Sequence, residues 1–250
     1  MLTKLKTRIK RLFFPDIHYR LHRMPGSLKK LGTDYGGWII PTDRLNEGSV
    51  CYLAGAGEDI SFDVLVAGLF HCDVYIFDPT PRAKKHFERV VASASGGDPI
   101  TLYGKHRYAI DEETARHLHF KEIGIWKKAD QVRFFAPKDE THVSHSISNL
   151  QETESWFLAT VERLSDIMRR NGHQRIDLLK LDIEGAEFEV IDTILEDKLP
   201  IGILCVEFHA GNGDLDPTRA AVKKLEDHGY AVVARENLDF TFVNLGLPNV

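Results

Sequence analysis

The stretch DLLKLDIEGAEFEV, Asp177–Val190, decides how this chain folds. Its first part, Asp177–Leu181, is an apolar run typical of a buried strand, and the apolar spacing after it is typical of a helix. Asp182, Glu184 and Gly185 lie between the two. Carboxylates are unfavourable at the buried end of a strand unless something there uses them. The strand-to-helix turn is therefore a candidate functional site.

Strands and helices alternate on both sides of this turn. Such alternation predicts a parallel sheet covered by helices on both faces. The last two predicted strands are separated by a short polar turn, which indicates a hairpin at the end of the chain. We expect strands at 49–54, 73–77, 119–126, 131–136, 177–181, 201–208, 230–234 and 240–245, helices at 60–70, 82–94, 156–171, 186–195 and 217–228, and a polar loop at 137–154.

Charge divides the chain into two parts. The 250 residues, 43% hydrophobic, suit one large α/β domain or a domain with a small appendage. Residues 1–30 carry nine Lys or Arg and one acid, a net +8, and the other 220 carry 23 basic and 36 acidic residues, a net −13. An acidic body argues against broad nucleic-acid binding, which needs clustered cations.

The basic N-terminal part is predicted to be separate from the main domain. We expect a basic helix and connecting segment over 1–33 and one domain over 34–250. Apolar residues within 2–14 recur at helical spacing between lysines and arginines. Weak contact of residues 1–14 with an acidic membrane surface is one interpretation. Packing on the domain with a solvated basic face is favoured, because a single short helix binds lipid weakly.

The cysteines indicate a reducing compartment. Cys51, Cys72 and Cys205 are far apart and odd in number, which argues against a disulfide framework or a zinc ribbon. No stretch reaches the roughly 18 apolar residues of a membrane span, and the N-terminus lacks the apolar core of a secretory signal. We therefore expect a cytoplasmic protein.

Two histidine pairs have spacings that could bind a metal. His18 and His22 are four residues apart, and His142 and His145 are three apart. Neither pair has an evident matching third ligand. The sequence therefore predicts no metal site.

A glycine turn follows the strand at 49–54. Gly55 and Gly57 let the backbone approach a ligand closely, and the helix that follows offers free N–H groups. About 20 residues later Asp78 ends the next strand, where an acid can accept hydrogen bonds from both ribose hydroxyls. Together, the turn and the acid predict a nucleotide-like cofactor.

The residues around the turn favour a cofactor without phosphates. A dinucleotide fingerprint needs a third glycine where this chain has Ile60, and Glu58 and Asp59 would repel a pyrophosphate. The cation S-adenosylmethionine suits an acidic rim better. A nicotinamide-dependent oxidoreductase stays open as an alternative.

Four polar residues at two strand ends form the candidate catalytic set. In an open α/β sheet, ligands lie beyond the carboxyl ends of the strands, where Asp182 could face the donor or orient an acceptor hydroxyl. Glu184 follows it, and Glu187 is typical of an acid in a first helical turn. Glu207 and His209 end the next strand and point to the same face, so His209 or Asp182 could act as general base.

These stretches together resemble the FkbM family of S-adenosylmethionine-dependent methyltransferases. Leu179–Glu187 matches the family signature K-[IL]-D-[IV]-E-G-x-E, and residues 206–209, VEFH, resemble the strand that follows it. Residues 54–63 and 77–81 resemble the motifs G-x-G-E-D-I-S-F-D and F-D-P-T-P of a bacterial subgroup. The resemblance extends from about residue 34 to the end.

The resemblance implies a class I methyltransferase fold, with a seven-stranded, mostly parallel sheet, helices on both faces and an antiparallel last strand. It implies S-adenosylmethionine as cofactor and a small-molecule or glycan acceptor, methylated on a hydroxyl oxygen. A non-catalytic binding module on the same fold stays open. It implies that Gly55 and Gly57 line the donor, that Asp78 holds the ribose, and that Glu122 and Ile123 lie near the adenine. From their places at the glycine turn and the strand end, Ala54, Glu58 and Asp182 are further predicted donor-binding residues.

Overall fold

The computed structural model describes residues 17–24, 26, 28–96, 100–102, 106–108, 110–135, 156–209 and 214–248. The basic helix expected at 2–14, the loop expected at 137–154 and the pair His142 and His145 lie outside these residues. None of the helices in the described ranges is long and apolar enough to cross a bilayer.

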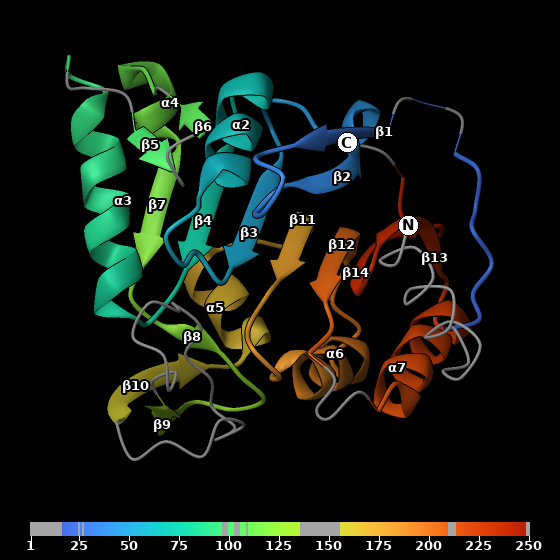
Figure 1. Ribbon diagram of the computed structural model, residues 1–250. Helices are drawn as coiled ribbons and strands as arrows, with labels where there is room; N and C mark the ends of the chain where they lie inside the picture. Colours follow the sequence, from blue (N-terminus) through green and yellow to red (C-terminus); the bar gives the residue numbers. More distant parts are fainter. Residues whose placement is uncertain are drawn as a thin grey trace, which may run out of the picture.

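A seven-stranded sheet forms the centre of the molecule (Figure 1). Its order is β13-β14-β12-β11-β3-β4-β7, and within it β14 runs antiparallel to both neighbours. This confirms the predicted fold with its antiparallel last strand. The strands are β3 Val50–Ala54, β4 Asp73–Phe77, β7 Leu118–Lys121, β11 Ile176–Leu181, β12 Ile201–Glu207, β13 Tyr230–Glu236 and β14 Asp239–Asn244.

Helices cover both faces because successive strand residues point to opposite sides. On β3, Leu53 packs into one core cluster with α2 and α3, whereas Tyr52 packs into a second with α5, α6 and α7. Both faces of β11 are buried, which explains why four of its six residues are Ile or Leu, with Asp177 and Lys180 as buried charges between them. The helices are α2 Ser61–Phe70, α3 Pro81–Ser93, α4 Glu112–Arg116, α5 Leu164–Asn171, α6 Glu187–Glu196 and α7 Asp216–Asp227.

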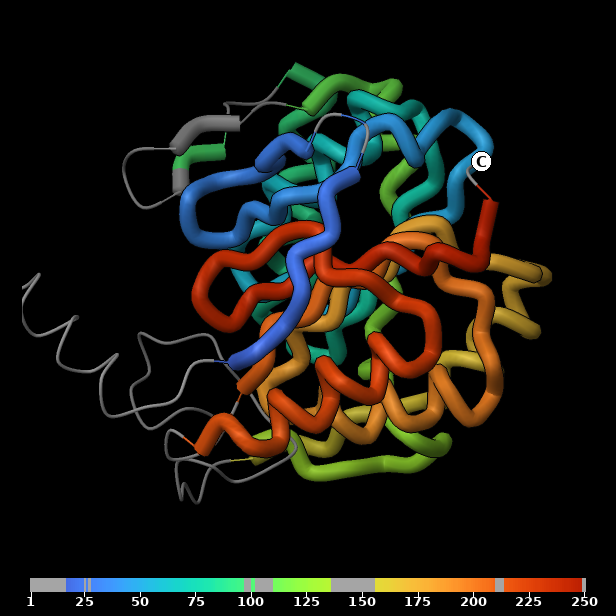
Figure 2. The backbone as a smooth tube through the Cα atoms, turned by 90° about the vertical axis from the view of Figure 1, so that its right-hand side faces the viewer, coloured from blue at the N-terminus to red at the C-terminus, as the bar shows by residue number. Residues whose placement is uncertain are grey.

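A short hairpin closes one end of the core. β1 Leu28–Leu31 pairs antiparallel with β2 Trp38–Pro41, so strand pairing spans the boundary expected at residue 33. Figure 2 shows this N-terminal segment, in blue, crossing the red C-terminal strands. There the Thr241 hydroxyl donates to the Ile39 carbonyl oxygen at 2.7 Å. The single-turn helix η1 Thr42–Arg44 follows, and β5 Ile100–Leu102 and β6 His106–Tyr108 form another small hairpin.

The prediction of a single helix at 156–171 is wrong for its first half, whereas α5 confirms its second half. Residues Trp156–Glu162 form strand β10, which pairs antiparallel with β9 Asp130–Phe135 and parallel with β8 Gly124–Ile125. The residues WFLATVE are rich in aromatic and β-branched side chains, which favour a strand. The strand predicted at 119–126 is also divided, between β7 and β8.

Three strands of the large sheet meet at Gly55. Its N–H donates to the Phe77 carbonyl oxygen at 3.0 Å, and the Asp182 N–H donates to the Ala54 carbonyl oxygen at 3.2 Å. Gly55 has φ +85°, and a Cβ there would lie 1.8 Å from the Asp182 carbonyl oxygen. The tips of β3 and β11 can therefore approach this closely only because residue 55 is glycine.

Replacement of Gly55 by alanine should destabilise the protein by about 3 kcal/mol or more, because overpacking adds to the strain of positive φ. Gly172→Ala is the matched control. Gly172 has φ +75° and open space around its Cβ position, so it should lose only about 1 kcal/mol. Urea unfolding of both variants measures the difference. Equal losses would contradict the close-approach explanation.

Candidate active site

A cavity of about 490 Å³ lies at the carboxyl ends of the parallel strands. Its volume is within the range of small-molecule sites, about 300–1,000 Å³. The glycine turn after β3, the end of β4, the turn after β11 and the end of β12 contribute to its wall. Gly124, Ile125 and Phe134 of the small β8-β10-β9 sheet also line it. In Figure 1 the small sheet lies at the end to which the arrowheads of the parallel strands point.

The wall of this cavity is strongly acidic. Among its described lining residues the basic side chains are Lys180 and His209. Such a wall attracts a cation and repels phosphate groups. The acidic lining residues are Asp34, Glu58, Asp59, Asp78, Asp182, Glu184, Glu207 and Asp239.

The structure brings most of the predicted donor-binding residues to the cavity. Gly55, Gly57, Glu58, Asp78 and Asp182 line it. Three predicted residues, Ala54, Glu122 and Ile123, are not among the lining residues. Ala54 is fully buried, and Glu122 pairs with Lys84 at 2.6 Å.

Asp78 organises the glycine turn. Its Oδ2 accepts hydrogen bonds from the backbone N–H groups of Ala56 and Gly57 at 2.9 and 3.1 Å. Its Oδ1 accepts from the N–H and the hydroxyl of Thr80, which also caps α3. These four bonds use about all the acceptor capacity of a carboxylate. The N–H groups of the turn that could have held a phosphate therefore bind Asp78 instead. In this structure Asp78 holds the glycine turn, which differs from its expected role as acceptor for both ribose hydroxyls.

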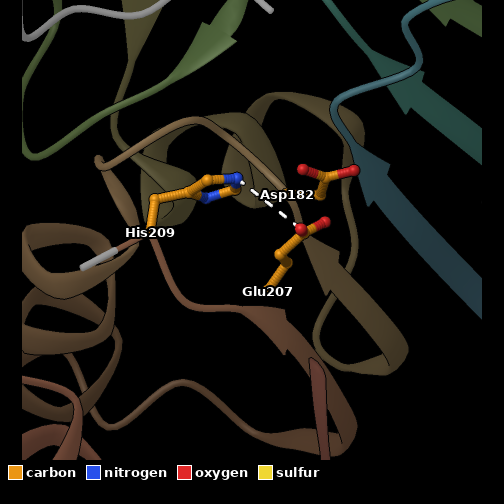
Figure 3. Close-up of side chains that lie close together, drawn as sticks. All are labelled: Asp182, Glu207 and His209. Carbon is orange, nitrogen blue, oxygen red and sulfur yellow. Dashed lines mark ion pairs between the residues drawn. The ribbon is translucent and has the colours of Figure 1, made fainter. Parts of the chain in front are cut away.

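The side chains of Asp182, Glu207 and His209 converge at the tips of β11 and β12 (Figure 3). One possible ligand atom of each lies within 4.8 Å of the others. Nε2 of His209 is 3.7 Å from Glu207 Oε1 and 3.5 Å from Glu184 Oε2. Glu184 itself has φ +55°, a strained conformation for a residue with a Cβ. All four predicted catalytic residues therefore lie together.

Glu187 holds this arrangement in place. Its side chain is fully buried and accepts from the N–H groups of Ile183 and Gly185 at 2.9 and 3.0 Å. It also lies 3.0 Å from Nδ1 of His209. The sequence did not predict this role, because Glu187 lies in the first turn of a helix, where an acidic residue is common without any further function.

Lys180 is a second site residue that the sequence did not predict. Its buried ammonium group donates to the Gly55 carbonyl oxygen and lies 3.3 Å from Asp182 Oδ2. Burial lowers the pKa of Lys180, but Asp182 and Asp63 outweigh it and raise the pKa. Burial raises the pKa of Asp63 to about 6, although Lys180 opposes this shift. The positive charge of Lys180, which lies inside the predicted strand, therefore partly neutralises the negative charges of Asp182 and Asp63.

The ionisation of the strand tips differs from that of free side chains. Burial raises the pKa of Glu207 to about 8, and the charges of Asp182 and Asp239 act in the same direction. Burial lowers the pKa of His209, but the bond to Glu187 and the charges of Glu187, Glu184 and Asp182 outweigh it and raise the pKa to about 10. At neutral pH His209 therefore carries its proton, which makes it a weaker candidate for general base than Asp182.

The turn Asp34–Trp38 forms a further part of the wall. Thr33 donates its hydroxyl to Asp59 Oδ2 at 2.6 Å and so fixes this turn beside the glycine turn. Tyr35 is largely exposed, but partial desolvation of its phenol raises the pKa, and the charges of Asp182 and Glu207 raise it further. The sequence indicated this segment only as a lead-in to the domain.

The raised pKa of His209 predicts a specific loss of stability with pH. The protonated imidazole stabilises the folded state fully below its ordinary pKa of 6.5, and this stabilisation is lost as pH rises through about 10. The protonated carboxyl of Glu207 also stabilises the folded state, and that stabilisation is lost as pH rises through about 8. Between pH 8 and 10, in chelating buffer, the free energy of unfolding should fall for the wild type and stay flatter for His209→Gln. Equal slopes would contradict the assignment.

Comparison with known proteins points to one family. The family model described as Methyltransferase FkbM domain matches residues 56–232. No curated protein matches the chain. One solved structure that it resembles is a precorrin-6y C5,15-methyltransferase from Geobacter metallireducens GS-15. The two are 15% identical, the match covers 80% of this chain and 83% of that chain, and the TM-score is 0.40.

Proposed function

The chain belongs to the FkbM methyltransferase family, and from this premise we propose that it transfers a methyl group from S-adenosylmethionine to a hydroxyl oxygen of a sugar or of a natural-product-like small molecule. The acidic cavity supports the proposal most directly. Eight acidic side chains line it beside one lysine and one histidine. A cavity of this charge suits a donor that carries a sulfonium and an ammonium group.

The residues present fit this donor. Gly55 and Gly57 bring the backbone to the cavity, and Glu58 and Asp59 add negative charge at the start of α2. Gly124, Ile125, Phe134 and Pro79 supply an apolar wall on the β8-β10-β9 side, where a flat base would pack. When bound, S-adenosylmethionine supplies a methyl group on a sulfur that leaves as a neutral thioether.

The chain itself has to hold the acceptor in line and to accept its proton. Effective alignment of two bound partners is worth several kcal/mol of a barrier, about 7–11 in the best cases. Asp182 lies at the junction of the glycine turn and the acidic strand tips, so we assign it as the acceptor of the hydroxyl proton. Glu184, Glu207 and the protonated His209 orient the acceptor by hydrogen bonds.

The cavity disfavours a nicotinamide-dependent oxidoreductase. A pyrophosphate is normally held by free N–H groups of the turn after the first strand. Here Asp78 accepts two of these N–H groups, and Glu58 and Asp59 lie beside them. A non-catalytic binding module would keep the cavity and lack turnover, so it is separated from an enzyme only by a turnover measurement.

Calorimetric titration distinguishes the cofactors. S-adenosylhomocysteine should bind the wild-type chain with one site, and NADH should give no binding heat at the same concentrations. Asp78→Asn should weaken S-adenosylhomocysteine binding about tenfold or more, because it removes an acceptor that holds the glycine turn. Binding of NADH in place of S-adenosylhomocysteine would overturn the proposal.

Turnover is measured with isotope-labelled S-adenosylmethionine and cell extract, with mass spectrometry to detect a labelled small molecule or glycan. Asp182→Asn should keep the fold and lower the yield of labelled product about 10²–10⁴-fold, the usual contribution of a general base. Asp192→Asn is the control, since Asp192 pairs with Lys224 outside the cavity. Normal methylation by Asp182→Asn would refute its role, and binding of the donor without any labelled product would indicate a binding module.

A further inference from the structure

Asp182, Glu207 and His209 have the geometry of a metal-ligand set. One oxygen of each acid and one ring nitrogen of His209 lie within 4.8 Å of one another. Carboxylate and imidazole ligands bind a divalent cation at about 2.0–2.2 Å, which places ligand atoms roughly 3–4 Å apart. The 3.7 Å between His209 Nε2 and Glu207 Oε1 falls in this range. Small side-chain rotations would therefore suffice to bring the three groups to one ion.

The orientation of His209 is an independent feature that points to a ligand. Glu187 is not a member of the three-residue set, and its fully buried carboxylate contacts Nδ1 of His209 at 3.0 Å. Two backbone N–H groups hold this carboxylate in place. Histidines that bind metals commonly use the other ring nitrogen in this way, to fix the ring and direct the free nitrogen at the ion. In this structure the arrangement directs Nε2 towards Glu207 (Figure 3), and His209 lines the cavity.

Two of the three groups have a further charged neighbour. Glu184 Oε2 lies 3.5 Å from Nε2 of His209, a contact that a bound ion would replace. Lys180 contacts Asp182 through Oδ2 at 3.3 Å, so Oδ1 is the carboxylate oxygen left for an ion. Among the described residues, this is the one group of three or more histidine, cysteine or acidic side chains with such spacing. Metal binding requires a neutral imidazole, so a bound cation takes the place of the proton on Nε2. In the metal-bound form the ion, and not a protonated His209, then orients the acceptor.

We propose that Asp182, Glu207 and His209 bind one divalent cation at the acceptor end of the cavity. Two carboxylates and one imidazole suit a cation of intermediate hardness, such as Mn²⁺. Three protein ligands leave coordination positions open, which would accept two neighbouring oxygens of an acceptor such as a vicinal diol. This role in acceptor binding rests on the proposed function, whereas the cation site itself does not.

The proposal differs from the sequence-based expectation of no metal site. That expectation considered histidines three or four residues apart, the spacing of ligands on one helix. The proposed ligands come instead from two strands, with 25 and 27 positions separating Asp182 from Glu207 and His209. The topology brings them together because β11 and β12 are parallel neighbours.

Binding of Mn²⁺ alone, without methyl donor, tests the site. Electron paramagnetic resonance of the full-length chain titrated with MnCl₂ should show one bound ion. Pulsed measurements on the wild-type complex should show coupling to a directly bound nitrogen. Glu207→Gln should weaken Mn²⁺ binding at least about tenfold, and His209→Gln should do the same and abolish the nitrogen coupling.

Asp239→Asn is the matched control. Asp239 lies opposite Glu207 in the pairing of β12 with β14, so this substitution removes an acid beside Glu207 without removing a proposed ligand. It should weaken Mn²⁺ binding less than about threefold. Circular dichroism checks the fold of each variant, and the nitrogen coupling of the wild type stands even if a variant unfolds. No bound Mn²⁺, no nitrogen coupling, or equal affinity in all variants, which means an adventitious ion only, would overturn the proposal.

Titration with S-adenosylhomocysteine separates this result from the proposed function. A chain that binds S-adenosylhomocysteine but not Mn²⁺ would refute the cation site and leave the methyltransferase proposal intact. A chain that binds Mn²⁺ with the nitrogen coupling but not S-adenosylhomocysteine would support the cation site and refute the donor.

Discussion

The close approach of Gly55 to the backbone of Asp182 is the constraint on which the site depends. It lets the tips of β3 and β11 lie together, with the Asp182 N–H on the Ala54 carbonyl oxygen. Any Cβ at residue 55 would separate the two tips. The glycine turn and the acidic turn therefore form one wall, and a ligand that spans both can contact the polar groups of each.

A second requirement is to hold many like charges in one place. Lys180 forms an ion pair with Asp182. Glu187 contacts the N–H groups of Ile183 and Gly185 and Nδ1 of His209. Each is buried, so each interaction acts where screening by water is weak. Removal of one member of such a set leaves an uncompensated buried charge, which is typically far more destabilising than loss of a surface pair. Lys180 and Glu187 thus stabilise the arrangement of the acidic side chains around the turn.

Periodicity was sufficient to predict the large sheet, because apolar runs separated by helical spacing have few other folded solutions. It failed at 156–171, where a short strand directly precedes a helix and the two periods run together. It also could not reveal the role of Glu187, whose position suits an ordinary helix start, or of Lys180, which lies within an apolar strand. Both roles depend on which side chains the topology brings close, and that information is not local in sequence. The four candidate catalytic residues could be predicted from the sequence, because ligands bind at the strand ends of such sheets.

The acidic tips have a physical consequence for how the site is maintained. Glu184 is held at positive φ, and Glu207 has its pKa raised to about 8 by burial and by neighbouring charges. Backbone strain and repulsion between like charges both oppose folding. Such features persist only where the surrounding structure is stable enough to hold them in place. Here that structure is the sheet itself, whose parallel neighbours β11 and β12 fix both tips. A ligand that brings positive charge relieves the repulsion, so binding and stability are coupled at this end of the sheet.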